Sequence, residues 1–274
     1  MVTRKDYNKI AVQAAHAVLL EIIRVLGEYR ESIVLVGGWV PQLLFKDKGD
    51  LHTGSIDVDL ALNHRKITDE GYKSIHDLLV ERGYQPGKQP FIFHRSITIS
   101  GAEIKVQVDL LSGEYEGSGK SHRHQRIQQI HARKVRGCDL AFNHPIELTI
   151  DGNLPGGAKD SAVIQVASIV PFLIMKAIVL DDRMKEKDAY DIYYCLRQYG
   201  DKLDKLVAEF KPYMENGLVK EGLEKLAKNF SNIGHIGPKF VSAFEEVTEG
   251  EERAMLERDA FERVNYLLQK LGVV

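Results

Sequence analysis

The sequence has little of what marks several large classes of protein. Its two cysteines, Cys138 and Cys195, lie far apart and make neither a disulfide framework nor a zinc-ligand spacing. No apolar run reaches the roughly 18 residues that a membrane-spanning helix needs, and no signal-peptide core follows the charged start. With a formal net charge of −2, the chain is not a polycation. We therefore expect a cytoplasmic protein without a membrane partner, in which any contact with nucleic acid comes from a local patch.

The chain of 274 residues, 44% of them hydrophobic, can build one large domain or two modest ones. Its patterning changes near Val163. Earlier segments mix short apolar strands with helices, whereas later segments have the 3.6-residue period of amphipathic helices. We expect an α/β fold with a mixed sheet and flanking helices in residues 1–162, and a helical domain in residues 163–274.

The pattern predicts the individual elements as follows. Strands are expected at 33–36, 56–62, 91–99 and 103–111, with one or two more within 140–150. Helices are expected at 8–29, 41–45, 68–82, 171–185, 188–199, 203–210, 217–230, 237–247 and 251–271. Thr68 is the expected N-cap of the third helix.

Two short motifs in the first half indicate phosphate and metal chemistry. Gly37-Gly38 ends an apolar strand, and such a turn lets the backbone approach a phosphate closely. Asp57 and Asp59 lie two residues apart in the next strand, so both carboxylates leave the same face of the sheet. Asp109 lies in a third apolar strand. If that strand pairs beside the second, three carboxylates converge, which is the oxygen-rich environment that Mg²⁺ prefers.

The order of these motifs resembles the DNA polymerase beta-like nucleotidyltransferase superfamily, and within it the AbiEii/AbiGii toxin family. The matching stretches are 34–39, 53–60, 106–110 and 176–192. The resemblance implies a nucleotidyltransferase-type sheet that transfers a nucleoside monophosphate (NMP) from a nucleoside triphosphate (NTP) to an acceptor, with tRNA a plausible one. It also implies a role as a toxin in abortive infection or in a type IV toxin–antitoxin system, with a cognate antitoxin as partner.

The resemblance also implies roles for particular residues. Asp57, Asp59 and Asp109 would be catalytic and would bind one or two Mg²⁺ ions. The nucleotide would be bound by Gly37, Gly38, Ser55, Lys176, Lys187, Asp188 and Asp191. The gap from Gly38 to Asp57 is longer than in compact members of the superfamily.

Three cations in the second half follow helical spacing. Lys176, Arg183 and Lys187 would share one face if a single helix ran through all three, and such a face suits a triphosphate or an RNA backbone. An ordinary solvated helix face is the plainer interpretation. Lys176 stands out because its neighbours are apolar. Asp188 or Asp191 could cap the following helix or orient Lys187.

A basic segment, 120–136, follows the Asp109 strand. No acid occurs between Gly117 and Cys138, so a polyanion passing the acids would meet Lys120, Arg123 and Arg126. A contact with acceptor RNA or with a triphosphate is as compatible with this composition as a mobile basic loop.

The sequence leaves the function open between classes. One is a Mg²⁺-dependent nucleotidyltransferase acting on RNA as a toxin or defence effector. Within the same fold, the acceptor could instead be a small molecule of the antibiotic type, or a protein. The other class is a nucleotide-binding scaffold without turnover.

Overall fold

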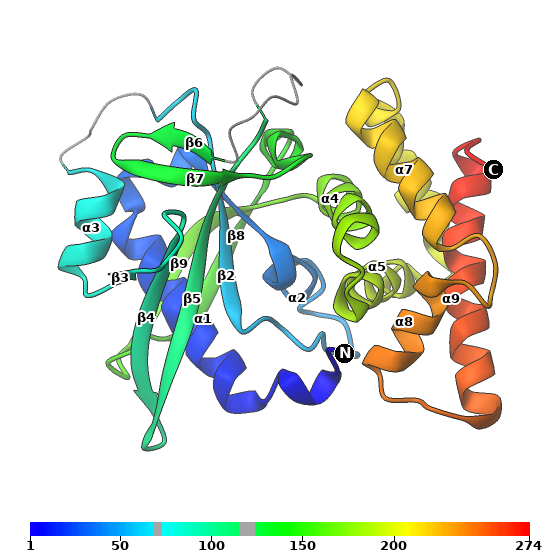
Figure 1. The fold of residues 1–274 in the computed structure, drawn as a ribbon, viewed down its shortest axis with the longest axis horizontal. Coiled ribbons are helices and arrows are strands. Elements are labelled where there is room, and N and C mark those ends of the chain that lie inside the picture. Colours follow the sequence, from blue (N-terminus) through cyan, green and yellow to red (C-terminus); the bar gives the residue numbers. More distant parts are fainter. Residues whose placement is uncertain (68–72, 115–123) are drawn as a thin grey trace. The chain divides into compact units, whose positions relative to one another are not determined.

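The computed structural model describes residues 1–67, 73–114 and 124–274 and divides them into two compact units (Figure 1). The sheet unit comprises residues 7–43 and 54–168, and the helical unit comprises 1–6, 44–53 and 169–274. Among the described residues, no helix is long and apolar enough to cross a membrane. The α/β fold class, with a mixed sheet followed by helices, is confirmed.

The sheet unit is built on one mixed sheet of nine strands within the described residues. Its main path runs β3-β4-β5-β2-β1-β9-β8, and β7 joins it by pairing with β5 and with β6. The strands are β1 (Ile33–Val36), β2 (Asp57–Leu62), β3 (Gln85–Pro86), β4 (Ile92–Ile99), β5 (Ala102–Ser112), β6 (His124–Ile127), β7 (Ile130–Lys134), β8 (Ile146–Asn153) and β9 (Lys159–Val166). At the centre, β2 pairs with β1 antiparallel and with β5 parallel.

Helix α1 (Lys9–Val25) packs along this sheet, in contact with β2, β4, β5, β8 and β9 (Figure 1). Its N-terminus is capped because the Asn8 side chain accepts a hydrogen bond from the Ala11 amide at 2.9 Å. A stripe of apolar residues, including Val18 and Leu19, is fully buried. Helices α2 (Val40–Leu44) and α3 (Ile75–Glu81) are shorter.

The helical unit contains α4 (Ile169–Arg183), α5 (Glu186–Gln198), α6 (Leu203–Phe210), α7 (Gly217–Asn229), α8 (Ile236–Phe244) and α9 (Gly250–Lys270). All six helices were predicted, with ends shifted by three residues or fewer. Within the unit α4 packs on α7 and α5, and α8 packs on α5 and α9.

The segment 44–53 belongs to the helical unit, although it lies between two motifs of the sheet unit in the sequence. Phe45 packs edge-on against Tyr194 on α5 and against Tyr199, which follows the end of α5. The Tyr194 hydroxyl donates to the carbonyl of Asp50 at 2.7 Å, and Arg197 pairs with the Asp50 carboxylate. This docked segment accounts for the long gap between Gly38 and Asp57. Each unit is built from more than one segment of the chain, so a single boundary between residues 162 and 163, as predicted, does not separate the two units.

Several predicted elements differ from the observed ones. The expected helix 68–82 is described only as Ile75–Glu81, and its N-cap is Ser74, whose hydroxyl accepts from the Asp77 amide at 3.1 Å. Thr68 lies outside the described residues. Of the one or two strands expected within 140–150, β8 begins at Ile146 and continues to Asn153. The 3₁₀ helix η5 (Cys138–Phe142) occupies the start of that range, and β9 lies later in the chain.

Candidate functional site

The predicted acids lie on adjacent strands in the middle of the sheet. In the parallel pairing of β2 with β5, Asp59 is directly opposite Asp109, and Asp57 is opposite Gln107. Facing residues of neighbouring strands project to the same side, so the three carboxylates share one face. All three are partly buried, whereas Val58 and Val108, which project to the other side, are fully buried. The predicted pairing of the Asp109 strand beside the Asp57/Asp59 strand is confirmed.

The Gly37-Gly38 turn lies directly against one of these acids. Val36 at the end of β1 pairs with Asp59, and Gly37 begins the 3₁₀ helix η3 (Gly37–Trp39) with a φ of 72°. A Cβ atom on Gly37 would lie 2.0 Å from Oδ2 of Asp59. Only glycine therefore fits both the left-handed conformation and the carboxylate beside it.

Hydrogen bonds orient the neighbouring acids. The Ser55 hydroxyl donates to the Asp57 carboxylate, and the Gln107 amide donates to Oδ2 of Asp109 at 2.9 Å. The Trp39 indole donates to the backbone carbonyl of Asp57 at 2.8 Å, which ties the glycine turn to the start of β2. Both Trp39 and Ser55 therefore position Asp57, Trp39 by binding its backbone carbonyl and Ser55 by binding its carboxylate.

The carboxylates are not gathered around one point. Within residues 1–67, 73–114 and 124–274, no group of three or more His, Cys, Asp or Glu side chains is placed to hold a metal ion. The Asp57 side chain is turned toward Ser55, which precedes β2, and the Asp109 side chain toward Gln107 on β5. For all three acids to bind one ion, these side chains would have to rotate toward one another.

A further carboxylate, Asp139, lies close to the end of β5. A Cβ on Gly113 would lie 1.9 Å from its carboxylate atoms. Burial raises the pKa of Asp139, and nearby His64 and Arg65 oppose that shift. Burial also raises the pKa of the adjacent Cys138 thiol, reinforced by the negative charges of Asp139 and Asp59. Sequence reasoning missed Asp139, because no apolar strand surrounds it.

Lys176, Lys187, Asp188 and Asp191 form a buried ion-pair cluster inside the helical unit. Lys176 Nζ on α4 lies 2.8 Å from Oδ1 of Asp188 and 2.7 Å from Oδ2 of Asp191. The second contact is an ion pair without hydrogen-bond alignment. Lys187 Nζ lies 2.7 Å from Oδ1 of Asp191. Both aspartates are fully buried.

Two more residues complete the cluster. Arg183 Nε lies 2.8 Å from Oδ2 of Asp188, and His52 Nε2 lies 2.9 Å from Oδ1 of Asp191. The His52 ring also stacks on Tyr190 and meets Tyr194 edge-on. Nothing in the sequence around His52 indicated this contact, because it depends on how the segment 44–53 folds back.

The cluster shifts the pKa values of its members in opposite directions. Burial alone would lower the pKa of Lys176 and raise that of Asp191, but their mutual attraction outweighs burial and reverses both shifts. Burial and the Lys187 charge lower the pKa of His52 to about 4, against the opposing effect of Asp191. Near neutral pH Lys176 is therefore positively charged, Asp188 and Asp191 are negatively charged, and His52 is neutral.

The single-helix interpretation of the three cations is wrong. Helix α4 ends at Arg183, and Lys187 lies in the first turn of α5, so the cations meet across a helix–helix connection. The N-cap of α5 is Lys185, not Asp188 or Asp191, and its side chain makes no capping hydrogen bond. Instead, the two aspartates form ion pairs with the buried lysines. A role for these residues toward a nucleotide stays a prediction.

Part of the basic segment forms a β-hairpin, β6 with β7. Arg126 pairs across the strands with His131, and Ile127 with Ile130. Ile127, Ile130 and Ala132 are buried, whereas Arg126, His131 and Arg133 are exposed, so the hairpin has an apolar inner side and a basic outer side. The loop interpretation is therefore wrong for residues 124–134. Lys120 and Arg123 lie outside the described residues.

Comparisons with known proteins give a distant likeness of structure. Neither a family model nor a curated protein matches the chain. The chain is similar to a solved structure described as "Crystal structure of putative nucleotidyltransferase from H. pylori", with a TM-score of 0.44 and 12% identity over 95% of this chain and 96% of that one.

Proposed function

We propose that the protein is a metal-dependent nucleotidyltransferase that moves an NMP group from an NTP to an acceptor. The observation that carries the proposal is the register of β2 and β5, which sets Asp59 opposite Asp109 with Asp57 on the same face. The contact of Gly37 with Asp59 adds a phosphate-type turn beside the acids.

Asp57, Asp59 and Asp109 are the residues that would bind Mg²⁺, since hard cations favour carboxylate oxygens. When bound, the ion would neutralise triphosphate charge and lower the pKa of an attacking hydroxyl. Rotation of Asp57 away from Ser55, and of Asp109 away from Gln107, would free the oxygens for this purpose. Asp109 is then the candidate base for the acceptor hydroxyl.

The chain offers several groups for the nucleotide. Backbone N–H groups after Gly37 and Gly38 would donate to phosphate oxygens. The Ser55 hydroxyl, which donates to Asp57 in this structure, would donate to a phosphate oxygen instead. We keep Lys176, Lys187, Asp188 and Asp191 as further candidates on the strength of the family resemblance.

The first test replaces the central acid. We expect Asp59→Asn to lower incorporation of radiolabelled NMP into total RNA at least about a hundredfold, because it removes a carboxylate that stabilises transition-state charge. Chelation should abolish the activity and Mg²⁺ should restore it. Asp151→Asn, in an exposed position of β8, is the matched control.

Unchanged incorporation by Asp59→Asn would rule out the assignment of the acid. If the wild type binds NTP but transfers nothing to RNA, small molecules or proteins, the scaffold alternative is favoured. The same variant addresses a toxin role: induced expression of the wild type should arrest growth, and Asp59→Asn should not.

The acceptor that we favour is RNA, supported by the basic outer side of the β6–β7 hairpin. We expect Arg126→Ala to weaken RNA binding and to reduce the slope of log affinity against log salt by roughly one unit, because one phosphate contact is lost. Lys88→Ala, also an exposed cation of the sheet unit, should leave the slope unchanged. An unchanged slope for Arg126→Ala would remove the hairpin from the acceptor site.

A further inference from the structure

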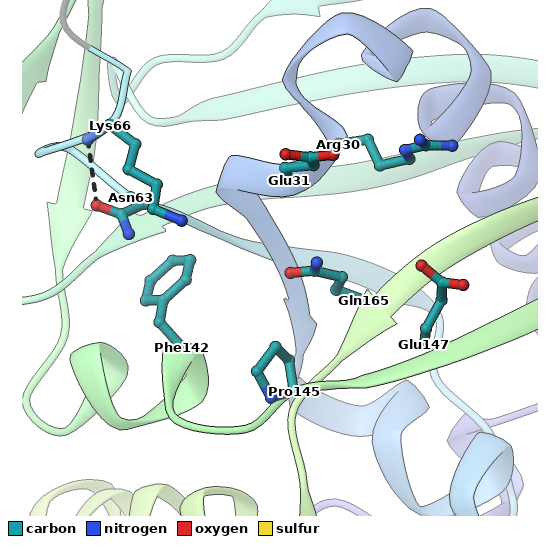
Figure 2. A pocket seen from close by; sticks show the side chains of 8 residues that line it. All are labelled: Arg30, Glu31, Asn63, Lys66, Phe142, Pro145, Glu147 and Gln165. Carbon is teal, nitrogen blue, oxygen red and sulfur yellow. Dashed lines mark hydrogen bonds between the residues drawn. The ribbon is translucent and has the colours of Figure 1, made fainter.

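The sheet unit contains a cavity of about 350 Å³ that the proposed transfer reaction does not use. Its lining comprises Arg30, Glu31, Asn63, Lys66, Phe142, Pro145, Glu147 and Gln165 (Figure 2). A volume of this size suits a small metabolite and exceeds what one or two waters fill.

The strand register places this cavity on the same sheet face as the acids. Within β2, Ala61 follows Asp59 by two residues, so both side chains project to one side, and Asn63 comes directly after the strand ends at Leu62. Gln165 on β9 is opposite Val34, and Val34 is opposite Ala61, which lies between Asp59 and Asn63. From strand spacings, the Cα atoms of Gln165 and Asp59 are about 12 Å apart.

The 3₁₀ helix η5 connects the two places. It contacts β1 and β5. Its first residue is Cys138, where the negative charge of Asp59 adds to the effect of burial in raising the pKa of the thiol. Its last residue, Phe142, lines the cavity. Among the described residues that line the cavity there is none of the three acids, so the cavity is a separate space from the acid site.

The polar groups around the cavity are available to a ligand. The Asn63 carbonyl oxygen accepts from the backbone amides of Arg65 and Lys66 at 3.1 and 3.3 Å, which leaves its NH₂ group as a donor. In Figure 2, this NH₂ group, the Lys66 ammonium and the Gln165 amide extend toward the space beside Phe142. Within the described part of the chain, the side chains of Lys66 and Gln165 have no hydrogen-bond or ion-pair partner.

The carboxylates of Glu31 and Glu147 are likewise without a partner among the described residues. The lining thus combines two amides, an aromatic ring, cations and carboxylates. A nucleotide matches each kind of group. Its base can lie against Phe142 with its edge toward the amides, its ribose hydroxyls can donate to a carboxylate, and its phosphate can meet Lys66.

We propose that this cavity is a second, non-catalytic nucleotide site, which takes a free mononucleotide or one nucleotide of an RNA strand. An inorganic anion alone would leave the carboxylates facing negative charge, and an apolar ligand would leave the amides unpaired. The proposal does not depend on the metal acids, so it can hold even if no transfer reaction occurs.

The test measures binding calorimetrically with the full chain carrying Asp59→Asn, in excess chelator, so that metal-dependent binding at the acids is removed. The probes are AMP, GMP, CMP and UMP, a single-stranded five-nucleotide RNA, and glutamine as a zwitterion. Lys66→Ala and Gln165→Ala should each weaken nucleotide binding about tenfold, because each removes hydrogen bonds to the ligand. Phe142→Leu keeps an apolar side chain but loses the aromatic face, and it should weaken binding by a similar factor.

Lys88→Ala and Gln89→Ala, both exposed on the sheet unit, are the controls and should bind like the parent protein. Saturable binding of an NMP identifies a free nucleotide as the ligand, and binding of the RNA alone identifies a strand. The proposal is overturned if no nucleotide probe binds up to about 1 mM, if Lys66→Ala and Gln165→Ala bind like the controls, or if glutamine binds and nucleotides do not.

Discussion

Gly37 is the residue whose replacement should act most directly on the predicted acids. It adopts a φ of 72°, and its missing Cβ leaves room for Oδ2 of Asp59, which would otherwise be 2.0 Å away. We expect Gly37→Ala to displace the Asp59 carboxylate and to abolish NMP transfer, and to lower the free energy of unfolding by about 1–3 kcal/mol. Urea denaturation and the incorporation assay measure the two effects.

Gly101 gives the matched control at this scale. Its φ of 81° is also left-handed, but a Cβ there would meet no atom within 4 Å. Gly101→Ala should therefore lower the free energy of unfolding through backbone strain but leave NMP transfer unchanged. Equal activity losses in the two variants would mean that displacement of Asp59 is not the cause.

At the scale of elements, the connection between α4 and α5 depends on the buried ion pairs. Lys176 lies between Asp188 and Asp191, which are both fully buried. We expect Lys176→Met to destabilise the protein by roughly 3–5 kcal/mol, because it leaves buried negative charge without its closest partner. Lys205→Met, exposed on α6, should change the stability little.

Urea or thermal unfolding followed by circular dichroism measures this difference. A loss below about 1 kcal/mol for Lys176→Met would show that water or Lys187 and Arg183 compensate the aspartates, which would make Lys176 available to a ligand. This outcome would strengthen its predicted role toward a triphosphate.

Some elements were readable from the sequence and others were not. The helices α4 to α9 have clear periods and Gly, Pro or Asn between them, so their existence and type were correct. The hairpin β6–β7 was missed because only Ile127, Ile130 and Ala132 face inward, and the surrounding cations resemble a loop. Strand β9 was missed because the change to helical patterning was placed within it, at Val163.

The candidate site, too, could be predicted from the sequence only in part. The shared face of Asp57 and Asp59 follows from a two-residue strand period, and a single pairing with β5 adds Asp109. In contrast, the partners of Lys176 and Lys187 depend on a turn between two helices and on His52, which comes from a distant segment. Local patterns do not encode contacts of that kind.

At the scale of the whole molecule, neither unit is a continuous stretch of chain. The residues 1–6 and 44–53 belong to the helical unit, and the sheet unit extends to Ser168. A fragment that begins at residue 163 would lack His52 and would split β9. For this reason, stability and its pH dependence are properties to measure on the full chain.

Acid should destabilise the full chain through His52. Burial and Lys187 lower the pKa of His52 from its ordinary 6.5 to about 4 in the folded protein, so the unfolded chain takes up a proton in this window before the folded one does. The free energy of unfolding should therefore fall by about 1.4 kcal/mol per pH unit between pH 6.5 and 4, roughly 3 kcal/mol in total. The lowered pKa values of Asp188 and Asp191 act at lower pH, because their stabilising effect is lost only as pH falls below the ordinary value of 3.8.

His52→Gln isolates this contribution, because glutamine can still donate to Asp191 but does not titrate. Urea unfolding of this variant at several pH values between 4.5 and 7.5 should give a flatter dependence than the wild type. His131→Gln, exposed on the hairpin, should keep the wild-type slope. If His52→Gln and the wild type lose stability in parallel, the acid sensitivity lies in other groups, and His52 is protonated with little cost in the folded protein.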